Sequence, residues 1–127
     1  MFEEYSLLNL YNYRKDLYIN NMDYRPEELN KRLKQIDNVI NSRPNGSKLL
    51  ENLNDISSIQ TSNKFDTSLS SEEKKEKFEK ILDKVKYCEK ILNLKNNALL
   101  YIEEIVYKNY LEFIGNFIRI DLNIKSK

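Results

Sequence analysis

Histidine and tryptophan are absent from this 127-residue chain, and cysteine, glycine and proline are rare. Without histidine the chain lacks the usual general base and the commonest metal ligand, which excludes Ser-His and Cys-His catalytic pairs. A single cysteine excludes an intrachain disulfide and a thiolate metal cluster. Two glycines cannot build a glycine-rich phosphate-binding loop. We therefore expect a non-enzymatic protein without a cofactor or a bound metal.

An excess of one charge is also lacking, because 21 Lys and Arg balance 20 Asp and Glu to a net charge of +1. Proteins that bind nucleic acid or anionic membranes through a basic surface usually have lopsided charge, so the balance counts against both partners. The chain starts Met-Phe-Glu-Glu, where a signal peptide would be basic, and charges interrupt its apolar runs well short of a membrane span. We expect a soluble cytoplasmic protein.

Apolar residues at helical spacing fill most of the chain, and two segments interrupt them. Residues 41–47 contain a proline and an Asn-Gly pair, which indicate a tight turn. Residues 60–71 are rich in serine, threonine and asparagine and indicate a polar linker. We predict one helical domain over 1–127, with an N-terminal helical part at 1–59, the linker at 60–71, and a long helix plus an apolar C-terminal part at 72–127.

The fold class that these patterns predict is mainly α, an irregular bundle of four to five helices. The first helix is expected within 3–22, the second begins at Pro26, and the third covers 47–59. The fourth opens with the capping box from Ser70 to Glu73 and continues to residue 92 with apolar steps of three and four. Residues 98–118 are the most apolar part and predict a further helix, with its continuity with the fourth left open.

A change of period near the C-terminus predicts a short β-strand. Apolar residues alternate with polar ones over 118–125, after Gly115. Only Thr61 to Phe65 offers an internal strand partner. The segment therefore either pairs with another chain, as strand addition to a partner or to a second copy, or is made helical by its tertiary context.

Few side chains are candidates for a catalytic or ligand-binding role. Cys88 has the spacing of a core residue in the fourth helix, so we interpret it as a buried structural thiol. Glu103 and Glu104 interrupt an apolar helix, and we interpret them as an exposed polar edge; the alternative is that one of them flanks a buried face. The fourth helix alternates lysine with glutamate, which favours a solvated, ion-paired face over a nucleic-acid site.

The nine tyrosines are the feature that most favours partner binding, because tyrosine is enriched at protein interfaces. The competing interpretation is that they line an ordinary core. Together with the C-terminal segment they give the following predicted partner-binding residues: Tyr11, Tyr18, Tyr24, Tyr107, Tyr110, Phe117, Arg119, Ile120 and Leu122.

The C-terminal half resembles small phage and prophage late-transcription regulators of the ArpU and RinA type. The resemblance lies in the run Ser71-Glu72-Glu73-Lys74 that opens the long helix, and in the segments 101–107 and 110–115. The family implies a C-terminal helix-turn-helix, but residues 121–127 are too few for a recognition helix of ordinary length. The resemblance therefore implies a phage or mobile-element context.

These observations predict a small inhibitor or regulator that docks on a larger host or defence protein. One alternative is a phage-type DNA-binding transcriptional regulator, against which the balanced charge counts. A second alternative is a homo-oligomeric structural or adaptor protein, including a homodimer.

Overall fold

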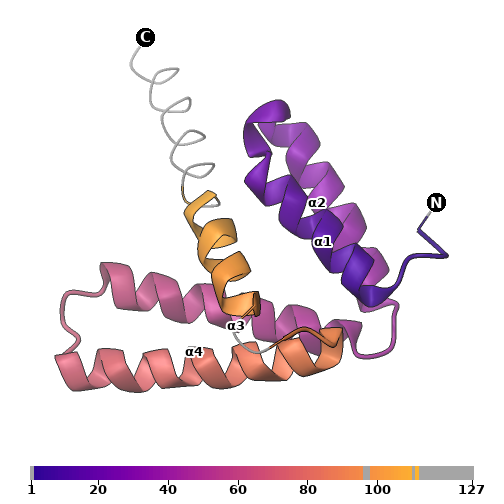
Figure 1. Ribbon diagram of the computed structural model, residues 1–127. Helices are drawn as coiled ribbons and strands as arrows, with labels where there is room; N and C mark the ends of the chain where they lie inside the picture. The colour runs from indigo at the N-terminus through magenta and orange to yellow at the C-terminus, as the bar shows by residue number, and fades with distance from the viewer. Residues whose placement is uncertain (1, 96–97, 110, 112–127) are drawn as a thin grey trace, which may run out of the picture. The chain divides into compact units, whose positions relative to one another are not determined.

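The computed structural model describes residues 2–95, 98–109 and 111 of the chain (Figure 1). These residues are mainly helical and contain no β-strand, which confirms the predicted fold class. Within the same residues, no helix has the length and apolar character needed to cross a membrane. The predicted C-terminal strand, with Phe117, Arg119, Ile120 and Leu122, lies outside the described residues.

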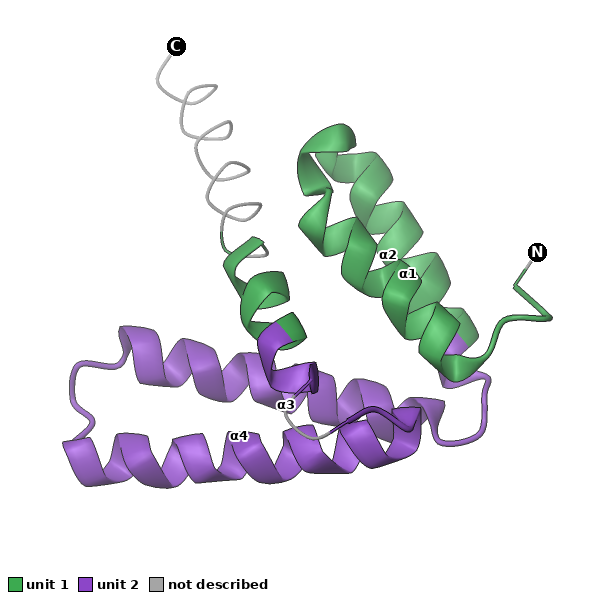
Figure 2. Cartoon of the chain, viewed as in Figure 1, with its two compact units in different colours: residues 1–39, 102–127 green, residues 40–101 purple. Residues whose placement is uncertain are grey.

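The chain divides into two compact units (Figure 2). Unit 1 comprises residues 1–39 and 102–127, and unit 2 comprises residues 40–101. Unit 1 therefore combines the beginning and the end of the sequence, whereas unit 2 is one continuous segment.

In unit 1, helix α1 (Leu7–Ile19) is followed by the short 3-10 helix η1 (Asn21–Asp23) and by α2 (Pro26–Asn41), which begins at the predicted proline. The Ser6 hydroxyl caps α1 by accepting a hydrogen bond from the N–H of Asn9 at 3.2 Å. The α1 helix is shorter than the predicted range of 3–22. Buried leucines and isoleucines from both helices form the apolar core: Leu10, Leu17, Leu29, Leu33 and Ile36.

A close backbone approach follows α2 in the predicted turn. Asn45 has the left-handed conformation, with φ of 65°, and Gly46 next to it is buried at the start of α3 (Gly46–Phe65). A Cβ atom on Gly46 would lie 1.7 Å from the carbonyl oxygen of Ile40. Only glycine has no Cβ, so this turn requires it.

Unit 2 consists mainly of a hairpin in which α3 and α4 (Ser71–Leu92) pack side by side (Figure 1). The capping box at the start of α4 is confirmed, because the Ser70 hydroxyl accepts from the N–H of Glu73 at 3.2 Å. The core of the hairpin contains Leu49, Leu50, Leu53, Ile56, Ile81, Val85, Cys88 and Leu92. All of these lie in 46–56 and 81–92, which we call the inner half of the hairpin.

The predicted linker at 60–71 is shorter in the structure, because α3 continues to Phe65 and only 66–70 connect the two helices. Residues 61–65 are therefore helical, and their nomination as a strand partner is wrong. The physical reason is hydrogen bonding by the polar side chains. Within the helix, the Thr61 hydroxyl donates to the carbonyl oxygen of Ser57 at 2.9 Å, and across the hairpin, Ser62 and Asn63 bond to α4.

Helix α4 ends at Leu92, so it is not continuous with the next helix. Asn93 has the left-handed conformation, and the N–H of Leu94 donates to the carbonyl oxygen of Glu89 at 2.9 Å, as in a Schellman motif. The chain is helical again over 98–109. This helix continues from unit 2 into unit 1.

Candidate functional site

Glu103 is buried, although it is ionisable and lies in an apolar helix. Leu99, Glu103 and Val106 follow one another at steps of four and three along helix 98–109, and all three are buried. These steps place them on one face of the helix. Glu103 therefore occupies a core position, with only 3% of its surface exposed.

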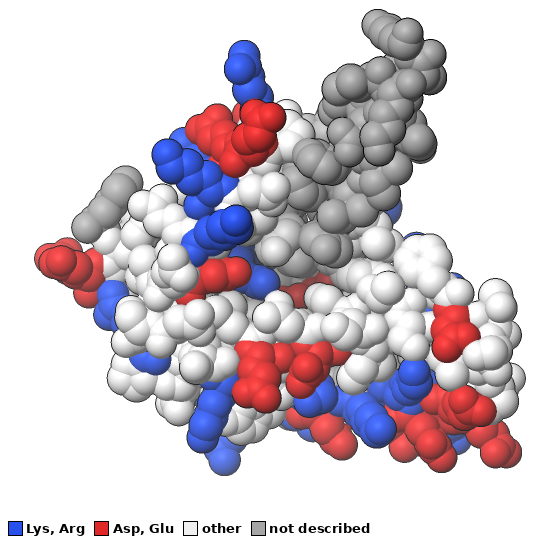
Figure 3. All heavy atoms as spheres, turned by 180° about the vertical axis from the view of Figure 1, so that it is seen from behind, with Lys and Arg blue, Asp and Glu red and all other residues white. Residues whose placement is uncertain are grey.

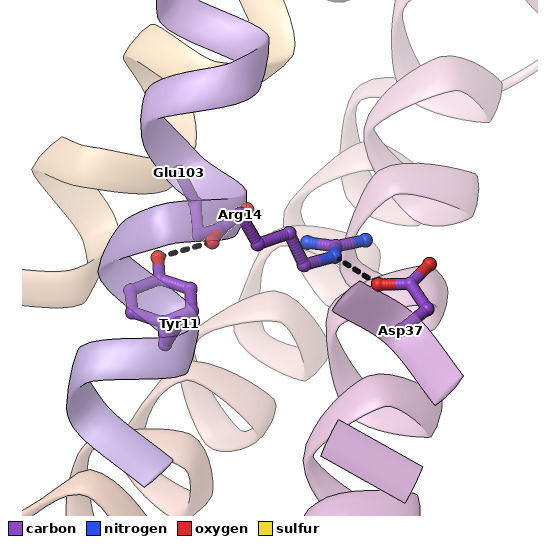
Figure 4. Close-up of polar contacts among 4 residues, drawn as sticks. All are labelled: Tyr11, Arg14, Asp37 and Glu103. Atoms are coloured by element: carbon purple, nitrogen blue, oxygen red, sulfur yellow. Dashed lines mark hydrogen bonds and ion pairs between the residues drawn. The ribbon is translucent and has the colours of Figure 1, made fainter. Parts of the chain in front are cut away.

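A buried polar cluster surrounds Glu103 within unit 1 and consists of Tyr11, Arg14, Asp37 and Glu103 (Figure 4). The Tyr11 hydroxyl donates a hydrogen bond to Glu103 Oε1. One helical turn further along α1, Arg14 Nε donates to Asp37 Oδ1 of α2 at 2.9 Å, as a salt bridge. Arg14 also lies over the ring of Tyr18, with its Cζ atom 5.2 Å from the centroid.

The electrostatics of the cluster follow from its burial. Burial raises the pKa of the Glu103 carboxyl, and this effect outweighs the hydrogen bond from Tyr11 and the charge of Arg14, which lower it. Burial alone would lower the pKa of the Arg14 guanidinium, but Tyr18, Asp37 and Glu103 outweigh it and raise that pKa. Arg14 is therefore a permanent cation, and Glu103 is the group that holds its proton more tightly than usual.

A second polar contact joins helix 98–109 to the N-terminal part of unit 1. Asn21 of η1 is buried, and its Nδ2 atom donates to the carbonyl oxygens of Tyr18 and Asn109 at 2.8 and 3.0 Å. Side-chain hydrogen bonds thus tie this helix to α1 at Glu103 and to η1 at Asn109. Six residues separate them, which is about 9 Å along a helix.

The interpretation of Glu103 and Glu104 as an exposed polar edge is correct for Glu104 and wrong for Glu103. The step from Leu99 through Glu103 to Val106 is the signal in the sequence that indicates the buried position. The apolar residues Tyr101 and Ile105 on the same helix indicate a different buried face, but the structure leaves both exposed. The hydroxyl of Tyr11 and the charge of Arg14 offset part of the cost of burying this carboxyl group.

A different arrangement occurs in the outer half of the α3–α4 hairpin, which we define as residues 57–65 and 71–80. All these residues are described, and none of the buried hydrophobic residues lies among them. Instead, Lys77 Nζ donates to the Ser62 hydroxyl at 2.7 Å, and Asn63 Nδ2 donates to the carbonyl oxygen of Lys74 at 3.4 Å. The outer half is therefore joined by polar contacts, whereas the inner half is joined by apolar packing.

Two phenylalanines are exposed on this outer half. Phe65 is 60% exposed and Phe78 is 46% exposed. Large apolar side chains are thus on the surface of the outer half, and polar ones are between its helices.

Charges of both signs accompany these rings. Figure 3 shows acidic and basic side chains interspersed along the hairpin rather than gathered by sign. The charged residues of α4 in the outer half are Glu72, Glu73, Glu76, Glu79, Lys74, Lys75, Lys77 and Lys80. In the inner half, Lys84 pairs with Asp55 of α3 at 3.0 Å, so the predicted ion-paired face partly bonds across the hairpin.

The structure does not bring the predicted partner-binding tyrosines onto one surface. Tyr11 is in the core of unit 1, where it bonds Glu103. Tyr18, Tyr24 and Tyr107 are half-buried, and the guanidinium of Arg32 lies over the ring of Tyr24 with a distance of 5.0 Å to its centroid. Tyr110 lies outside the described residues. The exposed phenylalanines of the hairpin were missed because the sequence does not show which apolar positions of α3 and α4 face solvent.

The remaining thiol and carboxyl groups form no metal centre in the part of the chain that the structure describes. Cys88 is fully buried, as predicted. No group of three or more Cys, Asp or Glu residues in this part is arranged to hold a metal ion. Glu89, on α4, is also buried rather than solvated, and its Oε2 accepts from the N–H of Leu99 at 3.0 Å.

Neither a family model, nor a curated protein, nor a solved structure matches this chain in sequence or fold comparisons.

Proposed function

We propose that this chain is a small non-enzymatic protein that docks on a larger protein through the outer half of its α3–α4 hairpin. The observation that carries the proposal is the exposure of Phe65 and Phe78 on a segment whose internal contacts are polar. Exposed aromatic side chains contribute disproportionately to protein interfaces when a partner buries them. Neither ring belongs to the buried apolar core of the hairpin, so the exposed part of each is available for contact with another protein.

The chemistry of the surface supports one kind of partner, a protein that offers an apolar pocket with a mixed-charge rim. The interspersed Lys and Glu of α4 give no field of one sign for a phosphate backbone or an anionic membrane. The resemblance of the C-terminal half to phage late-transcription regulators favours a mobile-element context. In that context the partner is a larger host or defence protein, and the protein acts as its inhibitor or regulator.

The test replaces both phenylalanines with serine. The matched control is Tyr87→Ser, which removes an exposed aromatic ring from the inner half of α4. A photoreactive amino acid at position 78 first identifies the bound protein in a lysate of the host cells. Calorimetry with the purified partner then measures the affinity of each variant at two salt concentrations.

We expect the double variant to bind at least about tenfold more weakly, since truncating an interface hot spot costs more than about 1.4 kcal/mol. Tyr87→Ser should bind like the wild type, and moderate salt should change the affinity little. Wild-type affinity of the double variant would contradict the proposal.

Two further measurements address the alternatives. Sedimentation of a wild-type dimer that the phenylalanine substitutions convert to a monomer would identify a second copy as the occupant of this surface. Binding to a labelled DNA duplex that weakens steeply with salt, and is unchanged in the double variant, would support the DNA-binding alternative instead.

A further inference from the structure

The buried polar cluster of unit 1 contains an unequal number of charges. Arg14 is its one cation, and Asp37 and Glu103 are its two carboxyl groups. With both carboxyl groups ionised, the cluster has a net charge of −1; Asp37 is half-buried, but Arg14 and Glu103 are buried, where an uncompensated charge is costly. One additional proton makes the cluster neutral.

The position of each group indicates where that proton lies. Asp37 is the direct salt-bridge partner of Arg14, at 2.9 Å, and its side chain is 35% exposed. Glu103 is more deeply buried and bonds the neutral hydroxyl of Tyr11. The groups that face Glu103 are Tyr11 and Arg14 of α1, with Asp37 of α2 on the other side of Arg14. The carboxyl with the weaker charge compensation is therefore Glu103.

We propose that this cluster is a proton-binding site, in which uptake or loss of one proton at Glu103 strengthens or weakens the attachment of helix 98–109 to α1. The proton exchanges with solvent, and no other covalent change is involved. Tyr11 remains able to donate to the carboxyl in both states. The inference does not depend on the proposed protein partner, because it concerns contacts within unit 1.

The direction of the pH dependence follows from linkage. Burial raises the pKa of Glu103 in the folded protein above its ordinary value of 4.5. The protonated carboxyl therefore stabilises the folded arrangement, fully below pH 4.5, and this contribution is lost as the pH rises through the folded-state value. A neutral side chain of the same shape, as in Glu103→Gln, should not lose it.

The experiment compares the melting temperatures of the wild type, Glu103→Gln and Glu104→Gln across the pH range 4 to 8. Glu104→Gln is the matched control, because it removes an exposed carboxylate at the next position. We expect the wild type and Glu103→Gln to melt together at the acidic end, and Glu103→Gln to melt at increasingly higher temperature as the pH rises. Glu104→Gln should keep the wild-type profile.

A direct measurement keeps the proposal testable if Glu103→Gln does not fold. The carboxyl carbon of Glu103 in the wild type can be followed by NMR through the same pH range. Titration above pH 4.5 supports the proton-binding site. Titration at or below that value, or parallel melting profiles for the wild type and Glu103→Gln, overturns it.

Discussion

Among the described residues, a glutamate is buried to the same extent in each unit, but the hydrogen-bond partners of the two glutamates differ in kind. Glu103 in unit 1 and Glu89 in unit 2 are both 3% exposed. Glu103 meets the side chains of Tyr11 and Arg14, whereas Glu89 accepts from the backbone N–H of Leu99 at the start of helix 98–109. A backbone donor at a helix N-terminus favours a negative charge whatever the surrounding sequence. Equal burial of two carboxyl groups therefore does not imply an equal response to substitution.

The largest change expected from a single substitution is that of Arg14→Ala in unit 1. It leaves Asp37 and Glu103 without their cation. Because Asp37 is 35% exposed, we expect a loss of unfolding free energy below the about 3–5 kcal/mol that breaking a fully buried ion pair costs, but above that of an exposed pair. Urea unfolding followed by circular dichroism measures the loss. Arg32→Ala is the control, since its guanidinium pairs with Glu28 at the surface of α2. An equal effect of the two substitutions would show that the cluster contributes no more to the unfolding free energy than an exposed ion pair does.

A smaller effect is expected from Glu89→Ala in unit 2. The substitution removes the acceptor of the Leu99 N–H, and leaving a buried donor unsatisfied costs about 1–3 kcal/mol. The amide of Leu99 should then exchange its hydrogen faster with solvent, in addition to the loss in urea unfolding. Unchanged protection of this amide would refute the capping role of Glu89.

The smallest effect is expected from Glu89→Gln, and the sign of its shift in melting temperature distinguishes Glu89 from Glu103. Glutamine keeps an oxygen acceptor for Leu99 and replaces Glu89 Oε1, a buried atom without a hydrogen-bond partner, by an amide nitrogen. The main loss is then the attraction between a carboxylate and the helix dipole, about 0.3–1 kcal/mol. At neutral pH we therefore expect Glu89→Gln to lower the melting temperature slightly, whereas Glu103→Gln raises it. Shifts of the same sign in both variants would remove the distinction between the two carboxyl groups.

Helix starts could be predicted from the sequence because their signals are local. Pro26 fixes a helical φ angle without needing a hydrogen-bond acceptor, and Ser70 with Glu73 forms a capping box from residues three apart. The end of α3 could not be predicted in this way. Thr61 and Asn63 have modest helix propensity, and the bonds that keep them helical include a contact with α4.

The buried position of Glu103 also depends on a distant residue. Tyr11 lies 92 positions earlier in the sequence, so no local pattern connects the two. Helix 98–109 has apolar residues on more than one face, as the exposed Tyr101 and Ile105 show. Periodicity alone therefore identified the helix but could not determine which of its faces would be buried.

The single cysteine, Cys88, is fully buried in unit 2, so thiol labelling can measure how often this unit opens. A thiol reagent needs access to the sulfur, so it labels Cys88 only in molecules whose α3–α4 core has opened. When reclosing is fast, the labelling rate divided by the rate for an unfolded chain is the opening equilibrium constant under native conditions. Because unit 1 contains no cysteine, this rate follows the opening of unit 2 without an introduced probe.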